Sequence, residues 1–455
     1  MEQRHHELWS SRAGFLLAAI GGAVGMGNIW RFPYMVGKNG GSAFVLVYLV
    51  CVVAVAIPIL MAEFLIGRRG QQSPVNAMAA VAAEARLSPA WRGVGWLGMT
   101  AAFLVLSFFG PIAAWAASFI PLAASGALSG MSGSEAEATL KAVLHNPVQL
   151  VALNGLFLAL TAFIVARGIK KGIEKSVKLL MPALFGLLII MVGYAAVAGD
   201  FAAGLAFLFA PDFSAIDAGV VLEAVGQAFL SIGIASGIMM AYGAYVPSNI
   251  SIGRAAATIS MADALAALLA GLAIFPIVFA TGLDPAHGPG LVFVIFPLAL
   301  GGMPGGGLLG TLFFVLLVIA TLTSSIGVLE PVVSWAEEKL NIRRCWGAVF
   351  AGIGAWVLGL ASLLSFSVWK QFYPLAFIGK FREANLFALA DGLISKIMLP
   401  MGGILIALFV GWRLSRDLVC EELGMGDGGA YSLWRFLLRY IAPAAVALIF
   451  VTGLI

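Results

Sequence analysis

The sequence predicts an all-α protein that crosses a membrane many times, with its helices arranged as two inverted repeats of five. The first observation is the composition: 61% of the 455 residues are hydrophobic and 11% are charged. A soluble domain of this size could not display that surface without aggregating. The second is that apolar runs of about 20 residues, enough to cross roughly 30 Å of hydrocarbon, recur along the chain. The third is that the first and sixth runs are interrupted by dense glycine clusters.

Eleven apolar runs are long enough to span. They lie at approximately 13–37, 43–66, 95–124, 148–166, 177–199, 219–246, 255–283, 307–336, 346–369, 386–412 and 433–455. Two further apolar stretches, Phe201–Ala210 and Leu291–Leu300, are too short to span and are expected to form re-entrant or surface helices in outer loops.

The placement of Lys and Arg predicts the orientation. Most basic residues fall in the N-terminal segment and in alternate loops, such as the cluster from Arg167 to Lys178. Positive charge near helix ends stays on the cytoplasmic side. The N-terminus is therefore expected inside and, after an odd number of spans, the C-terminus outside. This asymmetry also accounts for the net charge of +4 without a nucleic-acid partner.

Glycine clusters predict unwinding in the middle of two runs. The first is Gly21-Gly22-Ala23-Val24-Gly25-Met26-Gly27-Asn28, and the second is Ser231-Ile232-Gly233-Ile234-Ala235-Ser236-Gly237. Close packing of small residues between helices is the alternative, but clusters this dense, each beside polar residues, favour breaks. Broken helices at matching places in two halves indicate an inverted repeat with a binding site at the bilayer midplane. The expected repeats are 12–199 and 219–412, with 433–455 peripheral, within one domain spanning 1–455.

A family resemblance follows from these residues. Trp9, Arg12, Gly14, the segment 23–33 and Asn39-Gly40-Gly41 resemble the first-helix signature of the neurotransmitter:sodium symporters. The match continues through Ala62-Glu63-Phe64, Gly226-Gln227-Ala228-Phe229 and Leu322-Thr323-Ser324-Ser325, and covers most of the chain. The resemblance implies a symporter of a bacterial inner membrane, not an enzyme. It would carry a small zwitterionic solute, expected to be a neutral amino acid, together with two sodium ions by alternating access.

The resemblance also implies two sodium sites built from oxygen donors, as a hard cation prefers. The first would use Ala23, Asn28 and Ser231 together with the substrate carboxylate. The second would use Gly21, Val24, Ala320, Thr323 and Ser324. Back-bonding of the last two hydroxyls to their own helix is the alternative, because it is the commoner fate of Ser and Thr in spans.

Asp263 in the seventh run admits two readings. Animal members of the family bind chloride nearby, and a carboxylate there would supply the same negative charge, which predicts chloride independence. The other reading is a ligand of the first sodium ion, because an ungapped match places Ala262 where the family has an asparagine ligand.

The substrate would be held by main-chain groups of both breaks, with its carboxylate at the amides near Met26 and Gly27. Monoamine carriers of the family place an aspartate at the position of Gly25, so a hydrogen there predicts a substrate with its own carboxylate. The expected contact residues are Gly22, Ala23, Gly25, Met26, Gly27, Val105, Phe109, Leu230, Ser231, Ile232, Gly233, Ser236, Ser325 and Val328. Phe109 replaces a usual tyrosine, whose lost hydrogen bond costs roughly 1.5–3 kcal/mol. Another carboxylated amine is therefore the alternative substrate.

Ionisable residues inside spans are expensive and so point to function. By resemblance, Arg31 and Asp391 would form an outer gate, and Trp9, Tyr245 and Glu338 an inner one. The arginine of the inner gate is displaced: the chain has Arg4, and the family position is occupied by His6. Lys396 has no role in the family pattern, so a snorkelling or locally paired lysine is expected.

Other function classes fit less well. A channel would need a continuous polar lining rather than two short breaks. An enzyme would need a catalytic cluster, and all four histidines lie outside the apolar runs. The chain has no phosphate-binding loop for ATP. The expected partners are the amino-acid substrate and the lipid bilayer, with no organic cofactor and a monomeric state.

Overall fold

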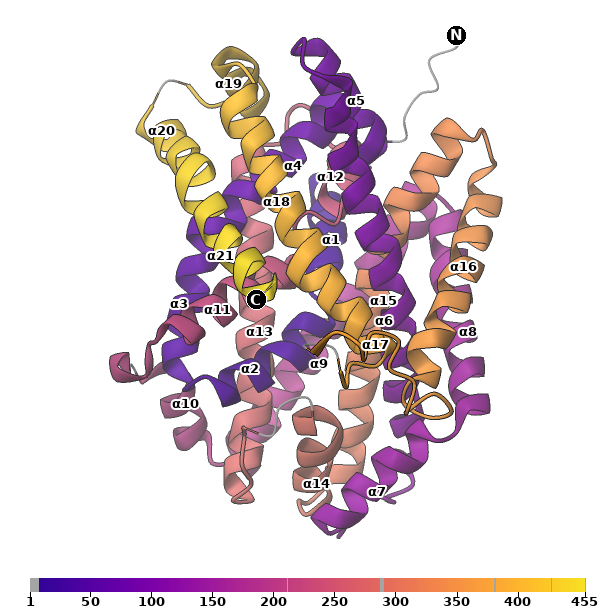
Figure 1. The fold of residues 1–455 in the computed structure, drawn as a ribbon. Coiled ribbons are helices and arrows are strands. Elements are labelled where there is room, and N and C mark those ends of the chain that lie inside the picture. The colour runs from indigo at the N-terminus through magenta and orange to yellow at the C-terminus, as the bar shows by residue number, and fades with distance from the viewer. Residues whose placement is uncertain (1–7, 211, 287–289, 380–381, 427, 455) are drawn as a thin grey trace.

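The structure is a computed structural model that describes residues 8–210, 212–286, 290–379, 382–426 and 428–454. Every regular element in these ranges is helical. Figure 1 shows long helices packed side by side along one axis, with the N-terminus at one end. By length and composition, nine helices in the described ranges could cross a membrane, or ten if a bent pair near the N-terminus counts as one.

The first five spans match the predicted runs in position. Span 1 is α1 (Arg12–Ala23), η1 (Gly27–Arg31) and α2 (Phe32–Lys38); span 2 is α3 (Ser42–Cys51), η2 (Val52–Ala56) and α4 (Ile57–Gly70); span 3 is α6 (Arg92–Ala124); span 4 is α8 (Pro147–Ala166); span 5 is η4 (Ile169–Glu174) and α9 (Lys175–Ala198).

The remaining spans follow the same pattern. Span 6 is α11 (Ala218–Ser231) and α12 (Ile238–Gly243); span 7 is α13 (Ile252–Ala280); span 8 is α15 (Gly306–Lys339); span 9 is α16 (Arg344–Leu364); span 10 is α17 (Leu386–Gly392), η8 (Leu393–Met398), α18 (Leu399–Leu408) and η9 (Phe409–Arg413); span 11 is α20 (Gly429–Phe436), η10 (Leu437–Ile441) and α21 (Ala442–Leu454). The two halves of span 6 are each too short to be counted as a membrane-spanning helix.

Shorter helices connect the spans. They are α5 (Pro74–Glu84), η3 (Pro89–Trp91), α7 (Gly133–Leu144), α10 (Phe201–Phe209), η5 (Phe213–Ala215), η6 (Leu291–Ile295), α14 (Phe296–Gly301) and α19 (Arg416–Leu423). The expected short helices at Phe201–Ala210 and Leu291–Leu300 are thus confirmed. Figure 1 places α7, α10 and α14 at the end opposite the N-terminus, and α5 and α19 at the N-terminal end.

Polar residues just outside the apolar runs set where several helices begin. The side chains of Ser11, Asp217 and Ser251 accept hydrogen bonds from main-chain N–H groups in the first turns of α1, α11 and α13. Such caps satisfy amides that have no partner within the helix. The π-helical segments η1, η2, η4, η6, η8, η9 and η10 have no comparable signal in the sequence.

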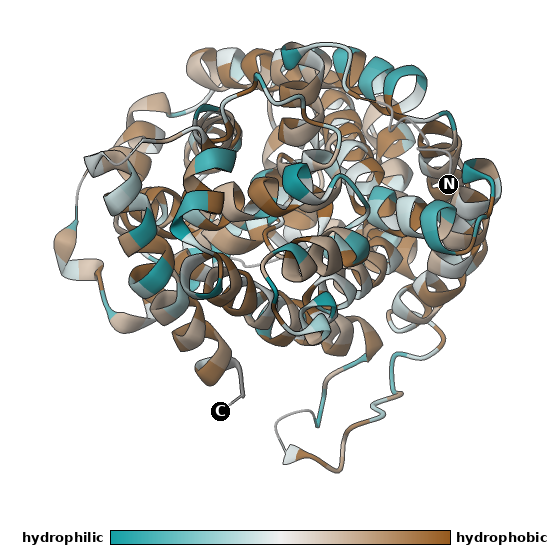
Figure 2. Cartoon of the chain, turned by 90° about the horizontal axis from the view of Figure 1, so that it is seen from above, coloured by the Kyte–Doolittle hydropathy of each residue, from teal (hydrophilic) through white to brown (hydrophobic). Residues whose placement is uncertain are grey.

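The interior is closely packed and the outside is apolar. The two longest helices, α6 and α15, lie against each other. A Cβ atom added at Gly67 would lie 2.1 Å from the Met240 carbonyl oxygen, so span 2 approaches α12 as closely as a glycine allows. Figure 2 shows hydrophobic residues on outward faces as well as inside. Leu156, Leu179 and Val197 are 69%, 72% and 88% exposed, which suits contact with lipid.

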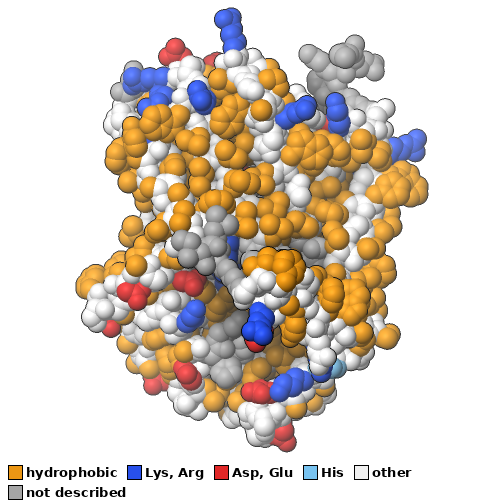
Figure 3. Space-filling model, viewed as in Figure 1, with side chains coloured by type: hydrophobic (Ala, Val, Ile, Leu, Met, Phe, Trp, Pro, Cys, Tyr) orange, Lys and Arg blue, Asp and Glu red, His pale blue; other side chains and the backbone are white. Residues whose placement is uncertain are grey.

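Charge is distributed unequally between the two ends. On the face drawn in Figure 3, Lys and Arg gather at the end that holds the N-terminus, whereas acidic side chains are more frequent toward the other end. This is the asymmetry from which a cytoplasmic N-terminus is predicted.

Candidate functional site

Span 1 is broken where the first glycine cluster predicts. Helix α1 ends at Ala23, and Val24 has an extended backbone with φ −68° and ψ 110°, although its N–H still donates to the Ile20 carbonyl. Helical structure resumes at Gly27, and the two halves are bent by 50°. The predicted interruption of span 1 is confirmed.

Span 6 is broken over the second cluster. Helix α11 ends at Ser231 and α12 begins at Ile238. Gly233, Ala235 and Gly237 have φ of 69°, 65° and 76°, a left-handed region that is unusual for alanine. The Ala235 N–H donates to Oε1 of the fully buried Glu63 at 3.2 Å. Glu63 of span 2 therefore braces the strained backbone of the break.

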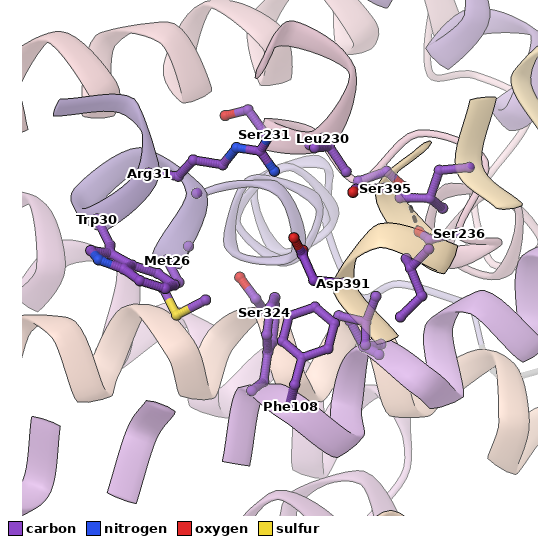
Figure 4. Close-up of a pocket in the computed structure, with 18 of the residues that line it drawn as sticks. Met26, Trp30, Arg31, Phe108, Leu230, Ser231, Ser236, Ser324, Asp391 and Ser395 are labelled. Carbon is purple, nitrogen blue, oxygen red and sulfur yellow. Dashed lines mark hydrogen bonds between the residues drawn. The ribbon is translucent and has the colours of Figure 1, made fainter. Parts of the chain in front are cut away.

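A cavity of about 220 Å³ lies between the two breaks. Figure 4 shows the side chains that surround it. Of the substrate contacts expected from the sequence, these line the cavity: Gly22, Ala23, Gly25, Met26, Gly27, Val105, Phe109, Leu230, Ser231, Gly233, Ser236 and Val328. Ile232 and Ser325 do not. Both are fully buried.

The sequence did not reveal part of the lining. The additional residues are Trp30, Tyr34, Phe108, Ile238, Phe387, Ile394, Ser395 and Leu399. Phe387, Ile394, Ser395 and Leu399 belong to span 10 and its π-helical segment η8. Apolar residues in an apolar span carry no signal that distinguishes a cavity wall from a packed core.

A buried polar cluster adjoins the cavity where spans 1, 6 and 7 meet. The Asn28 Nδ2 donates to Ser231 Oγ at 3.0 Å, to Asp263 Oδ1 at 2.8 Å and to the Asp263 carbonyl at 2.9 Å. The Ser231 hydroxyl donates to Asp263 Oδ2 at 2.7 Å, and the Tyr48 hydroxyl donates to the same oxygen at 3.3 Å. All four residues are at most 5% exposed. Three of the residues expected around the first sodium ion thus lie together, and Ala23 lines the adjoining cavity.

A second group of oxygens lies where span 8 meets the break in span 1. The Ser324 hydroxyl lies 3.5 Å from the Gly21 carbonyl oxygen and 3.4 Å from that of Val24. The Thr323 hydroxyl donates to the Ala320 carbonyl at 3.0 Å and to that of Ile319 at 3.2 Å. Ser324 therefore reaches across to span 1, whereas Thr323 bonds back to its own helix.

These oxygen groups suit an alkali cation better than a transition metal. Within the described ranges, no three His, Cys, Asp or Glu residues come together as a metal-binding group. The donors in both groups are carbonyls, hydroxyls, an amide and one carboxylate, which are ligands that hard cations prefer.

Arg31 and Asp391 both line the cavity, and Figure 4 shows their side chains entering it from different helices. They form no ion pair with each other in this structure, and Arg31 Nε has no hydrogen-bond partner among the described residues. Lys396, five residues after Asp391, is exposed and forms no ion pair within the described part of the chain. The pathway past Arg31 and Asp391 is not sealed by these two side chains.

Trp9 packs against the second half of span 6. Its main-chain N–H donates to the Tyr245 carbonyl at 3.2 Å, and its indole N–H to the Tyr242 carbonyl at 3.1 Å. The indole packs edge-on against Tyr242 with the ring centres 5.4 Å apart, and Trp9 is 4% exposed. Trp9 and Tyr245 thus come together as expected from the sequence.

Glu338, the third residue expected at the inner gate, also contacts the start of α5. Its carboxylate accepts from the Ser73 N–H at 2.8 Å and from Asn76 Nδ2 at 2.7 Å, which places it at the N-terminus of α5. Arg4 and His6 lie outside the described residues. Glu330 and Arg344 form a buried ion pair that no local pattern in the sequence indicates, and the Tyr245 hydroxyl donates to Glu330 at 3.0 Å.

Comparison with known proteins gives a consistent result. The profile of the sodium:neurotransmitter symporter family matches residues 6–135 and 134–455. YhdH of Bacillus subtilis, described as an uncharacterized sodium-dependent transporter, is 36% identical over 456 residues, which are 99% of this chain and 98% of YhdH. The sodium-dependent dopamine transporter of Bos taurus is 25% identical over 100% of this chain and 70% of its own length.

The chain also resembles a solved structure. The crystal structure of MhsT in complex with L-phenylalanine has a TM-score of 0.89 and 40% sequence identity, covering 98% of this chain and 100% of MhsT. This likeness confirms the predicted all-helical fold with broken first and sixth spans.

Proposed function

Because the chain belongs to the sodium:neurotransmitter symporter family and is a sodium-dependent membrane transporter, we propose that it couples sodium entry to the uptake of a neutral amino acid. The observation that carries this proposal is the position of the 220 Å³ cavity, which lies between the two broken spans and borders both groups of oxygens. Each sodium ion would supply about 1.4 kcal/mol per tenfold gradient and about 2.3 kcal/mol per 100 mV.

The cavity favours a substrate with an apolar side chain. Its wall at Gly25 carries no charge, so the carboxylate must belong to the substrate. Val105, Phe108, Phe109, Ile394 and Leu399 form an apolar wall. The similar protein MhsT was solved with L-phenylalanine, which supports a large apolar amino acid over a polar one.

Two sodium ions are proposed. The first would bind among Ala23, Asn28, Ser231 and the substrate carboxylate, which would couple ion to solute. The second would bind among the carbonyls of Gly21, Val24 and Ala320 and the hydroxyls of Thr323 and Ser324. The second site requires the Thr323 hydroxyl to leave its helix carbonyl, a bond of 3.0 Å.

Asp263 would make transport independent of chloride. Its carboxylate is fully buried and receives hydrogen bonds from Asn28, Ser231 and Tyr48, with no Lys or Arg among the described residues that contact it. A carboxylate so placed supplies the negative charge that would balance a nearby sodium ion. The same geometry lets Asp263 act as a ligand of that ion, so both readings of its role predict no need for chloride.

Alternating access would proceed from the conformation observed. The site is sealed on the side of Trp9, and Arg31 and Asp391 are unpaired, as in a transporter open toward the exterior. Pairing of Arg31 with Asp391, followed by withdrawal of Trp9 from span 6, would turn the site toward the cytoplasm. This assignment places the N-terminus inside and agrees with the basic residues gathered at that end.

Uptake of a mixed amino-acid panel into proteoliposomes tests the proposal. We expect accumulation of apolar amino acids under an inward sodium gradient, none under the same potassium gradient, and no change when gluconate replaces chloride. Uptake that is equal in sodium and potassium would contradict the coupling. Accumulation of a different carboxylated amine instead of an amino acid would contradict the substrate assignment while leaving the coupling intact.

Restoring a hydroxyl at Phe109 should tighten substrate binding. Phe109 lines the cavity, and a tyrosine there could donate to the substrate carboxylate, a bond to a charged group worth about 1.5–3 kcal/mol. Scintillation proximity binding should therefore show a Kd at least about tenfold lower for Phe109→Tyr. Phe108→Tyr is the matched control, since Phe108 lines the same cavity next in sequence, and it should not improve binding. Equal gains in both variants would show that the hydroxyl acts nonspecifically.

A further inference from the structure

A cleft of about 560 Å³ opens where span 4 ends and span 5 begins. It is lined by Ser10, Arg167, Lys170, Lys171, Glu174, Lys175 and Lys178. Five of these side chains are cationic and one is anionic. The proposed transport cycle uses none of the cations.

The single carboxylate of the cleft is already satisfied. Glu174 is buried, forms an ion pair with Lys178 at 2.7 Å and accepts from the Ser10 N–H at 3.0 Å. The other four cations are exposed and form no ion pair within the described ranges. The cleft therefore keeps a concentrated positive charge that no acidic side chain among the described residues, apart from Glu174, neutralises.

Membrane topology alone does not explain this concentration. Positive residues at this end set the orientation wherever they lie. A second cleft, near α5 and α19, holds Arg69, Arg86 and Arg413, but it also holds Glu84, Asp417 and Glu421. There Arg69 pairs with Glu84 at 2.6 Å and with Glu421 at 3.2 Å. Acidic side chains balance the basic ones in that cleft, whereas within the described ranges Glu174 alone opposes the five cations of the first cleft.

Exposed apolar side chains lie next to the basic residues of the cleft. The Arg167 guanidinium lies over the Phe163 ring at 4.1 Å, and Phe163 itself is 54% exposed. Leu179, next to Lys178, is 72% exposed. Cationic heads above exposed apolar side chains match the two parts of a phospholipid, a charged headgroup and hydrocarbon chains.

We propose that the cleft binds the headgroup of an anionic phospholipid, with the acyl chains lying along α8 and α9. Basic pockets between helices on the cytoplasmic side bind such headgroups, and each cation near the membrane surface adds to the attraction. An Arg and several Lys can share the phosphate oxygens. Ser10 lines the cleft and is the next residue after Trp9, which contacts span 6. The bound lipid would therefore touch the segment that closes the site in the proposed cycle.

Native mass spectrometry of the purified full chain tests this inference. Phosphatidylglycerol would be added to wild type and to a Lys170→Gln/Lys171→Gln/Lys175→Gln variant. The control variant, Arg86→Gln/Arg254→Gln/Lys339→Gln, loses the same charge at the same end outside the cleft. Each lost charge should raise the dissociation constant about fivefold, so the cleft variant should bind phosphatidylglycerol roughly a hundredfold more weakly. The control should bind within about twofold of wild type, and wild type should retain far less phosphatidylcholine.

Three outcomes would overturn the inference. Equal loss in both variants would show a diffuse field rather than a site. Equal retention of phosphatidylcholine would show binding without the phosphate charge. Displacement of phosphatidylglycerol by the same concentration of glycerol phosphate would show that the acyl chains contribute nothing, so that the cleft takes a soluble phosphate. None of these outcomes depends on the transported substrate, so the lipid site and the proposed function can fail separately.

Discussion

A Gly25→Ala variant is expected to lose sodium-dependent uptake. The added Cβ would lie 2.1 Å from Ser324 Oγ and 3.1 Å from Ser324 Cβ. Relief of the clash requires the Ser324 hydroxyl to turn away from the carbonyls of Gly21 and Val24, which it now approaches at 3.5 and 3.4 Å. Overpacking of this kind costs about 1–3 kcal/mol, and here it also removes a proposed sodium ligand. Binding of radioactive sodium should fall by more than about tenfold.

Gly226→Ala is the matched control for this variant. Gly226 lies in α11 of the broken span 6, and an added Cβ there meets no atom within 4 Å. Its uptake and thermal stability should match those of wild type. Full sodium-dependent uptake by Gly25→Ala would place the second ion away from Ser324. A loss of stability in Gly25→Ala larger than the roughly 1–3 kcal/mol expected from overpacking would show a folding defect instead, so stability is measured first.

An Asn28→Ala variant is expected to weaken sodium binding at the other ion site by a factor similar to that expected for Gly25→Ala. Asn28 Nδ2 donates to three oxygens, two of them on Asp263, and Asn28 Oδ1 accepts from the Gly25 N–H at 2.9 Å. Removal of the amide leaves the buried Asp263 carboxylate without its Asn28 donor. A hydrogen bond to a charged group is worth about 1.5–3 kcal/mol, which corresponds to roughly a ten- to hundredfold loss. Sodium-dependence curves of uptake should show a half-saturating concentration raised by that factor.

Asn154→Ala provides the comparison. Asn154 is an equally buried asparagine in span 4, and its amide atoms have no hydrogen-bond partner within the described residues. Removing it takes no bond from the site, so the sodium dependence should stay unchanged. If Asn28→Ala retained the wild-type curve, the first ion could not lie at this cluster.

The sequence alone predicts the fold because its strongest signals are long and local. Each apolar run became a helix within a few residues of its predicted bounds, since hydrocarbon thickness imposes a minimum length. The breaks near Gly25 and Gly233 were also predictable. Glycine clusters there coincide with polar residues, and positive φ at Gly233 and Gly237 needs the freedom of glycine.

The parts that escaped prediction depend on contacts between distant segments. Phe387 and Ser395 line the cavity, but nothing near them in the sequence separates them from lipid-facing neighbours. Glu338 is expected at the inner gate by resemblance, and the sequence did not predict that its carboxylate also accepts from the Ser73 N–H at the start of α5. That partner lies 265 positions away along the chain, beyond the reach of any local pattern.

In the proposed cycle, closure of the site on the side of Trp9 relies on the main chain of span 6. The indole N–H of Trp9 donates to the Tyr242 carbonyl, and its main-chain N–H donates to the Tyr245 carbonyl. Neither tyrosine side chain accepts a hydrogen bond from Trp9. Substitutions at positions 242 and 245 would therefore leave the two hydrogen bonds in place as long as the helix keeps its path, and of the contacts that Trp9 makes would remove only the edge-on packing of its ring against the two tyrosine rings. Release of Trp9 requires α12 to move as a body. The two hydrogen bonds that hold Trp9 therefore tolerate sequence divergence, but breaking them depends on a single rigid movement.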